Sequence, residues 1–198
     1  MRLPLAVLAL TLLPFGASAQ DTQPARIRGT VENVTADTLT VKSRDGETVA
    51  IALAPDWGVT GVAAAELSDI KPGDYVGIAS LPNTDGRDAA LEVLIFPKAM
   101  AGTGEGSYPW DLQPESTMTN ATVSSVEQVD GTTLKLTYKG EKKSIVVPPE
   151  APIVTFAEAA KTDLVPGATV FVPAQADASG AVTTNRVVVG TNGTLPPM

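Results

Sequence analysis

The amino-acid sequence predicts an all-β protein with two short helices, arranged as two tandem OB-like five-stranded barrels that are related by internal duplication. Three observations support this prediction. Segments of the first half recur in the same order in the second half, each half contains short runs rich in Val, Ile and Thr, and a stretch without Gly or Pro separates the third run from the fourth. Three strands, a short helix and two strands are the element order of an OB-fold. An open β-sandwich is the competing architecture.

Four matched segments indicate an internal repeat. The offset between the two copies is 92 residues for the first segment and 94 for the other three, so a two-residue insertion in an early hairpin accounts for the change. We therefore predict one OB-like repeat over residues 27–97 and a second over 119–190, with a linker at 98–118 and a flexible tail at 191–198. The matched pairs are 30–34 with 122–126, 51–56 with 145–150, 69–73 with 163–167, and 86–95 with 180–189.

The first two strands of each repeat follow from alternation and turn residues. In the first repeat, Val31 and Leu39 lie in short runs rich in Thr and Val, and Asp37 marks the turn between them. The dipeptide Asp45-Gly46 predicts a tight hairpin, because glycine tolerates the positive φ that such a turn requires. A third strand is therefore expected directly after this hairpin.

The remaining elements of the repeat are expected in a fixed order. The third strand, 49–53, should end at Pro55, since proline cannot donate a hydrogen bond to a neighbouring strand. Residues 62–69 and their counterparts 156–163 contain no Gly or Pro and favour a short helix. The turn at 71–74 then leads into a fourth strand at 75–81 and a fifth at 89–96.

The first nineteen residues have the pattern of a secretory signal peptide. A positive start at Arg2 is followed by an eleven-residue apolar run, and small residues precede a cleavage site between Ala19 and Gln20. The run is shorter than the ~20 apolar residues that span a bilayer. Cleavage would remove Arg2 and no acidic residue, which would change the net charge from −8 to −9. We therefore expect an exported bacterial protein, periplasmic or secreted, with no transmembrane span in the mature chain.

The linker at 98–118 carries the candidate site residues. Three alternating glycines at 102, 104 and 106 predict a mobile segment, yet Tyr108 and Trp110 follow directly in a chain with only nine aromatic residues. We expect these two rings, with Asp111 beside them, to pack between the barrels and fix their orientation. The alternatives are an aromatic platform for a sugar or peptide and a loop that orders on a partner.

The sequence resembles an uncharacterised bacterial family of exported proteins with tandem OB-like domains. The residues that carry the resemblance are the turn Lys71-Pro72-Gly73-Asp74 and the motif Pro109-Trp110-Asp111-Leu112, followed by Met118-Thr119-Asn120. Such chains are sometimes labelled metal ABC transporter permeases, but a permease needs several membrane-spanning helices. The resemblance implies a fold and a compartment, and it brings no catalytic residues.

Composition excludes several classes of function. The chain contains no Cys and no His, which rules out disulfides, Ser-His-Asp and Cys-His catalysis, and ordinary zinc, iron–sulfur and haem ligation. Its acidic balance, 22 acidic against 14 basic side chains, argues against a nucleic-acid partner. We therefore expect a non-enzymatic binding or interaction module without a cofactor, whose partner is an envelope protein, a peptide or a glycan. The alternative is an accessory protein for periplasmic metal or redox handling, with a divalent cation held by carboxylates.

Overall fold

The computed structural model describes residues 22–128 and 131–196, and the predicted signal peptide with its cleavage site between Ala19 and Gln20 lies outside them. The described chain is nearly all β. Its strands are β1 (Gln23–Val34), β2 (Thr38–Ser43), β3 (Thr48–Ala64), β4 (Tyr75–Pro82), β5 (Asp88–Ile95), β6 (Gly106–Pro109), β7 (Thr117–Gln128), β8 (Thr132–Tyr138), β9 (Glu141–Val147), β10 (Ile153–Ala157), β11 (Thr169–Ala176) and β12 (Val182–Gly190). Short 3-10 helices are η1 (Leu67–Asp69), η2 (Lys98–Met100) and η3 (Lys161–Asp163).

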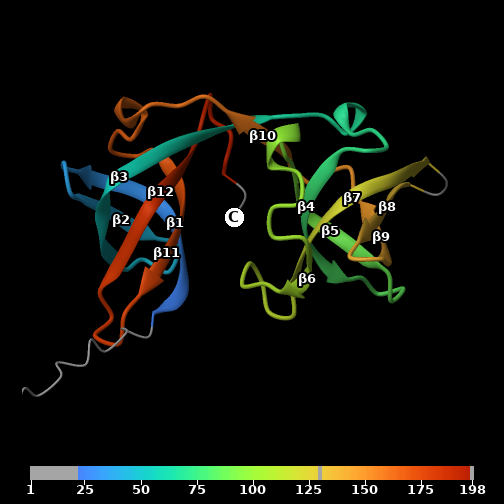
Figure 1. The fold of residues 1–198 in the computed structure, drawn as a ribbon, viewed down its shortest axis with the longest axis horizontal. Coiled ribbons are helices and arrows are strands. Elements are labelled where there is room, and N and C mark those ends of the chain that lie inside the picture. The colour runs from blue at the N-terminus through green and yellow to red at the C-terminus, as the bar shows by residue number, and fades with distance from the viewer. Residues whose placement is uncertain (1–21, 129–130, 197–198) are drawn as a thin grey trace, which may run out of the picture.

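The strands form one continuous sheet that closes on itself twice. Strands β12, β11, β1, β2 and β3 are hydrogen-bonded in that order, and β12 pairs with β3 to close a first barrel. Strands β5, β4, β7, β8 and β9 follow one another in the same way, and β9 pairs with β5 to close a second barrel. Figure 1 shows the barrels side by side, with β10 and the end of β3 spanning the space between them. The prediction of OB-like five-stranded barrels is confirmed.

Each barrel takes strands from both halves of the sequence. The first barrel combines β1–β3 with β11 and β12, and the second combines β4 and β5 with β7–β9. The last two strands of repeat 27–97 therefore complete the barrel that repeat 119–190 begins, and the reverse holds for the other repeat. This differs from the consecutive arrangement expected from the sequence. The cause is β3, which leaves the first barrel and carries the chain across to the second before β4 begins.

Matching irregularities occur at equivalent positions of the two repeats. The register of β1 against β2 shifts just after Val31, and that of β7 against β8 shifts just after Val123, 92 residues later. A turn from the other repeat binds at each place: the Gly73 N–H donates to the Val123 carbonyl, and the Gly167 N–H donates to the Val31 carbonyl, both at 2.8 Å. Both glycines have positive φ, 95° and 90°, which suits this tight turn. The exchange of strands is thus accompanied by the same local contact in each barrel.

Strand β3 continues beyond Pro55, so the prediction that the third strand ends there is wrong. The pairing of β12 with β3 runs to Thr184 opposite Leu53 and resumes with Arg186 opposite Gly58. Pro55 lies in this interruption, where no ladder hydrogen bond is required of its nitrogen. Proline is therefore tolerated inside a strand of 17 residues.

The predicted helices at 62–69 and 156–163 are also wrong. The end of β3 pairs antiparallel with β10, and only three-residue 3-10 turns, η1 and η3, follow. The pairing places Val62 opposite Phe156, its own equivalent 94 residues later, so the crossing strands meet symmetrically. Helix propensity over so short a stretch is weak, and hydrogen bonds to strands on both sides of β10 outweigh it.

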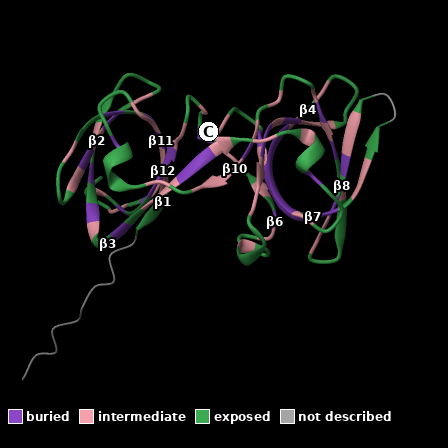
Figure 2. Cartoon of the chain, turned by 90° about the horizontal axis from the view of Figure 1, so that it is seen from above, coloured by how far each residue is buried: buried purple, intermediate pink, exposed green. Residues whose placement is uncertain are grey.

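Two separate apolar cores fill the barrels, and buried residues follow the inward faces of the strands (Figure 2). Leu164, from the second repeat, packs in the core of the first barrel, and Ile70, from the first repeat, packs in that of the second. Neither core can therefore form from one repeat alone. The first core is Val31, Leu39, Val41, Ile51, Leu53, Trp57, Leu164, Val170, Val172, Ala174, Val187 and Val189. The second is Ile70, Val76, Ile78, Ala90, Val93, Ala121, Val123, Leu134, Leu136, Ile145 and Val147.

The segment expected to be a mobile linker has defined structure. It contains η2 and then β6, which pairs with β7 of the second barrel. Before β6, the Thr103 carbonyl accepts hydrogen bonds from the Tyr75 hydroxyl at 3.1 Å and from the Asn120 amide at 3.3 Å. The linker is thus part of the second barrel. No helix in the described ranges has the length and apolar character needed to cross a membrane.

Candidate functional site

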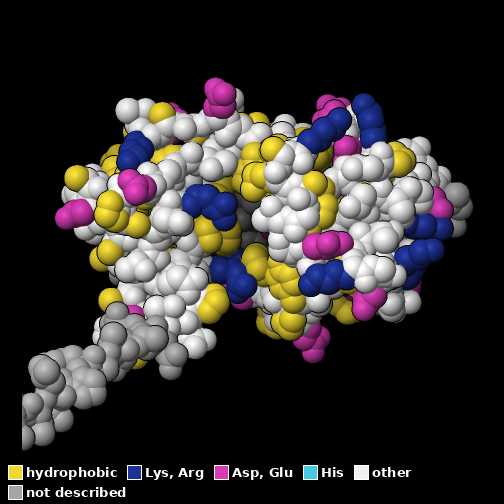
Figure 3. All heavy atoms as spheres, in the orientation of Figure 1, with side chains coloured by type: hydrophobic (Ala, Val, Ile, Leu, Met, Phe, Trp, Pro, Cys, Tyr) yellow, Lys and Arg dark blue, Asp and Glu magenta, His cyan; other side chains and the backbone are white. Residues whose placement is uncertain are grey.

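Three adjoining hollows form a cleft between the barrels, here called the inter-barrel cleft. An upper hollow of 940 Å³, a central hollow of 240 Å³ and a lower hollow of 650 Å³ follow one another. The upper and central hollows adjoin at Glu92, which lines both of them. The central and lower hollows share Tyr108, Trp110, Phe171 and Arg186. Figure 3 shows Lys and Arg side chains beside hydrophobic ones along this groove.

Aromatic and methionine side chains converge on the central hollow. They come from five places in the fold: the end of β5, the linker, the start of β7, β10 and β11. Of the nine aromatic residues of the chain, five line this hollow and Tyr75 packs edge-to-face on one of them, so most of the aromatic content lies here. These lining residues are Phe96, Met100, Tyr108, Trp110, Met118, Phe156 and Phe171.

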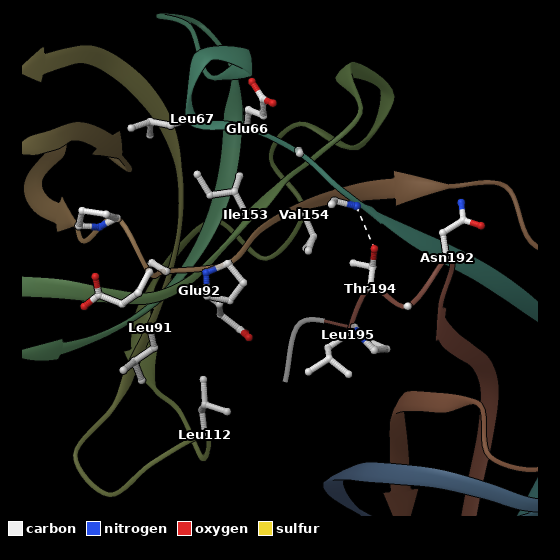
Figure 4. Close-up of a pocket in the computed structure, with 18 of the residues that line it drawn as sticks. Glu66, Leu67, Leu91, Glu92, Leu112, Ile153, Val154, Asn192, Thr194 and Leu195 are labelled. Atoms are coloured by element: carbon white, nitrogen blue, oxygen red, sulfur yellow. Dashed lines mark hydrogen bonds between the residues drawn. The ribbon is translucent and has the colours of Figure 1, made fainter.

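The upper hollow is larger, and the charged side chains of its described lining are Glu66, Glu92 and Glu150. Figure 4 shows Leu91, Leu112 and Ile153 on its walls and Thr194 on its far side, where the Thr194 hydroxyl accepts a 3.1 Å hydrogen bond from the Ala64 N–H. Much of the remaining lining is proline, alanine and main chain. Size alone therefore does not identify the site, and the aromatic and arginine side chains lie in the central and lower hollows.

Trp110 and Asp111 bridge the two barrels. The β6–β7 pairing attaches their segment to the second barrel, whereas their partners Arg26 and Arg28 lie on β1 of the first. The Arg26 guanidinium lies 4.1 Å from the Trp110 ring centroid, within cation–π range. Arg28 Nη2 donates to Asp111 Oδ1 at 2.7 Å, and Arg26 Nη1 lies 3.6 Å from Asp111 Oδ2. Tyr108 packs edge-to-face on Trp110, with ring centroids 6.2 Å apart.

Two buried donors at this contact lack a hydrogen-bond partner. Among the described side chains they are Arg28 Nε and Trp110 Nε1, and Arg28 is only 7% exposed. A buried unsatisfied donor costs about 1–3 kcal/mol, and folded proteins contain few of them. The Arg28 guanidinium also lies 5.7 Å from the Trp110 ring centroid, so both donors belong to the same contact between the barrels.

Burial and charge act in opposite directions on the titratable groups here. Burial alone would raise the pKa of Asp111, but the hydrogen bond and charge of Arg28, with the charge of Arg26, hold that pKa below its usual value. Burial raises the pKa of Tyr108, and Arg26 offsets part of the effect. Burial and the Glu105 carboxylate raise the pKa of Tyr75 to about 12. Asp111 is therefore ionised at neutral pH and both tyrosines are neutral hydrogen-bonding groups.

Replacement of Asp111 by Asn is expected to lower the free energy of unfolding by about 1–2 kcal/mol at pH 7, because Arg28 stays buried without its counter-ion. Since folding depresses the Asp111 pKa, its stabilisation is present above the unfolded-state pKa and lost as pH falls through the folded one. Urea denaturation at pH 7 and pH 3 should thus show a stability difference between wild type and Asp111→Asn that is smaller at pH 3.

The matched control is Asp85→Asn, which breaks an exposed ion pair with Arg87. It should change stability by less than about 0.5 kcal/mol at either pH. Equal effects of the two substitutions would show that the Asp111 contact contributes no more than a surface pair.

The sequence singled out Tyr108, Trp110 and Asp111, and the structure brings them together at the cleft. It did not single out Arg186 or the three phenylalanines of the central hollow, Phe96, Phe156 and Phe171. The scarcity of aromatic residues could have marked these phenylalanines as candidates. Their convergence on one hollow could not be predicted, because it depends on the exchange of strands between the repeats. Within the described residues, no group of three or more Asp and Glu side chains is placed to hold a metal ion.

Comparison of the chain with protein-family models, with curated proteins and with solved structures gives no match.

Proposed function

We propose that the protein is an exported, non-enzymatic binding module that holds an envelope protein, a peptide or a glycan in the inter-barrel cleft. The observation that carries the proposal is the convergence of half-buried rings, two methionines and an exposed arginine on one hollow between two barrels. Aromatic residues, methionine and arginine are the side chains enriched at recognition surfaces. The proposal that the protein is exported rests on the signal-peptide pattern of residues 1–19.

The cleft is suited to a ligand that both barrels contact at once. Phe171 and Arg186 belong to the first barrel, whereas Met118 belongs to the second and Met100 lies in the linker that joins it. The unbranched methionine side chains adapt their shape to a partner. Binding in the cleft would therefore bury apolar surface on two sides and use the existing relative position of the barrels.

Photocrosslinking from both walls tests the proposal. Benzoylphenylalanine at Met100, on the second-barrel side, and at Asn185, on the first-barrel side, should capture the same molecule from the cell envelope. The same group at Lys42, an exposed position on β2 outside the cleft, should not capture it. Different adducts from the two walls, or equal capture from Lys42, would contradict a ligand held between the barrels.

Thr103→Trp is expected to reduce both adducts about tenfold or more, because the indole would occupy the mouth of the central hollow. Thr103 is exposed, and its hydrogen bonds to described residues are made by its main chain, so the fold should tolerate a change of side chain. Thr103→Ser is the matched control and should keep wild-type yields. Undiminished capture by a folded Thr103→Trp variant would place the ligand elsewhere.

A further inference from the structure

Charge is distributed unevenly along the inter-barrel cleft. The described lining of the upper hollow includes Glu66, Glu92 and Glu150 and no Lys or Arg. The described lining of the lower hollow includes Arg26 and Arg186 and no Asp or Glu. Between them lies the central hollow with its apolar rings and methionines. The cleft therefore runs from an acidic end, through an apolar centre, to a basic end.

Exposed charges are present at both ends. Arg186, on β12, is exposed and forms no ion pair with a described residue, and it borders both the central and the lower hollows. Glu150, in the turn before β10, is exposed at the upper hollow. The chain has a net charge of −8, so an accessible arginine beside aromatic rings gives this end of the cleft a local charge opposite to that of the whole protein. It is complementary to a carboxylate on a ligand.

The rings of the central hollow favour an apolar side chain over a sugar. One face of Trp110 is covered by Arg26, and Phe96 packs edge-to-face with both Tyr75 and Phe156. Stacking on a sugar would require an open, flat ring face. A hollow of 240 Å³ is smaller than the ~300–1,000 Å³ typical of small-molecule sites and is suited to one bulky apolar side chain. Neutral and acidic glycans also carry no cation for the upper hollow.

We infer that the ligand is an extended peptide segment with a basic side chain in the upper hollow, a bulky apolar side chain in the central hollow and an acidic side chain in the lower hollow. The inference rests on the proposed function, since it names the ligand class of the same cleft. The charge gradient fixes the order of the three side chains along the cleft. Both barrels then contribute one charged end each to recognition.

Selection of a random dodecapeptide display library on the full mature chain tests this ligand class, with Thr103→Trp as the counter-selection. The expected result is a set of peptides in which Phe, Leu or Met lies between a Lys or Arg and an Asp or Glu. Enriched peptides without this charge pattern would overturn the inference, as would a selection that yields no peptide dependent on an open cleft.

Charge reversal then tests the assigned ends. Arg186→Glu should weaken binding of a selected peptide about 10- to 100-fold, and changing the acidic residue of that peptide to Lys should restore it. Glu150→Lys should weaken binding and be compensated by reversal of the basic residue. The matched control is Arg87→Glu, on the exposed turn between β4 and β5, which should leave affinity unchanged.

The outcomes separate the two proposals. If Met100 and Asn185 crosslink one ligand that is a glycan, the binding module stands and the peptide class fails. If peptides bind but Arg186→Glu has no more effect than Arg87→Glu, the assigned charge order is wrong. If the two wall positions capture nothing in common, the proposed function itself fails.

Discussion

Cleavage of the folded chain between residues 102 and 105 is expected to leave the two fragments associated as a complex of the uncut size. The exposed turn there contains Gly102 and Gly104 and should accept an inserted protease site. Each barrel core contains residues of both fragments, so separation would expose both cores to water. Size-exclusion chromatography with native mass spectrometry of the cut protein measures this directly.

Unfolding the cut protein and remixing its two fragments distinguishes the exchanged arrangement from two independent barrels. After denaturation in urea and dilution, the fragments should recover the native spectrum only when mixed in equal amounts, and neither alone should show a cooperative transition. If each fragment instead unfolds cooperatively on its own, the repeats close their own barrels and the exchanged arrangement is wrong. The uncut protein carrying the same insertion controls for the inserted sequence.

Leu164→Ala is expected to lower the free energy of unfolding by about 2–5 kcal/mol. The loss should be located in the first barrel, which begins with β1 at the N-terminal end of the described chain. Leu164 lies in repeat 119–190 and is 2% exposed, but it packs in the core built around Val31 and Ile51. Hydrogen exchange should therefore show lost protection in β1–β3 with β11 and β12, and little change in β7–β9.

Ile70→Ala is the reciprocal experiment and should deprotect β7–β9. Val165→Ala, next to Leu164 but 55% exposed, is the control and should change stability by less than about 0.5 kcal/mol. Loss of protection in β7–β9 after Leu164→Ala, with β1–β3 unchanged, would contradict the exchange of strands.

Local signals in the sequence were sufficient for most of the individual elements. The Asp45-Gly46 hairpin forms with Gly46 at φ 84°, and the five-stranded unit has the predicted order. The errors concern places where a partner strand decides the outcome. Pro55 does not end β3 because it lies in a register interruption, and residues 62–64 are extended because β10 pairs with them. Helix propensity and proline content carry no information on such partners.

The candidate site was predictable only in part for the same reason. Tyr108 and Trp110 stood out because aromatic residues are rare in this chain, Asp111 lies directly beside them, and the segment that holds all three adjoins the second barrel. Their partners Arg26 and Arg28 are separated from them by more than 80 residues. Nothing local in the sequence relates these arginines to the linker, because the contact arises from how the two barrels are placed.

The sequence by itself predicted two matching β units and the positions of most of their strands, and it determined which chemistries are excluded because the chain lacks Cys and His. Alternation, turn residues and composition are local properties, and they fix local structure. Only the tertiary structure decided which strands close which barrel and which side chains face the cleft between them. Barrel closure satisfies hydrogen bonds whether the last two strands come from the same repeat or from the other. The choice therefore depends on the path of β3 and β10, which only the folded chain reveals.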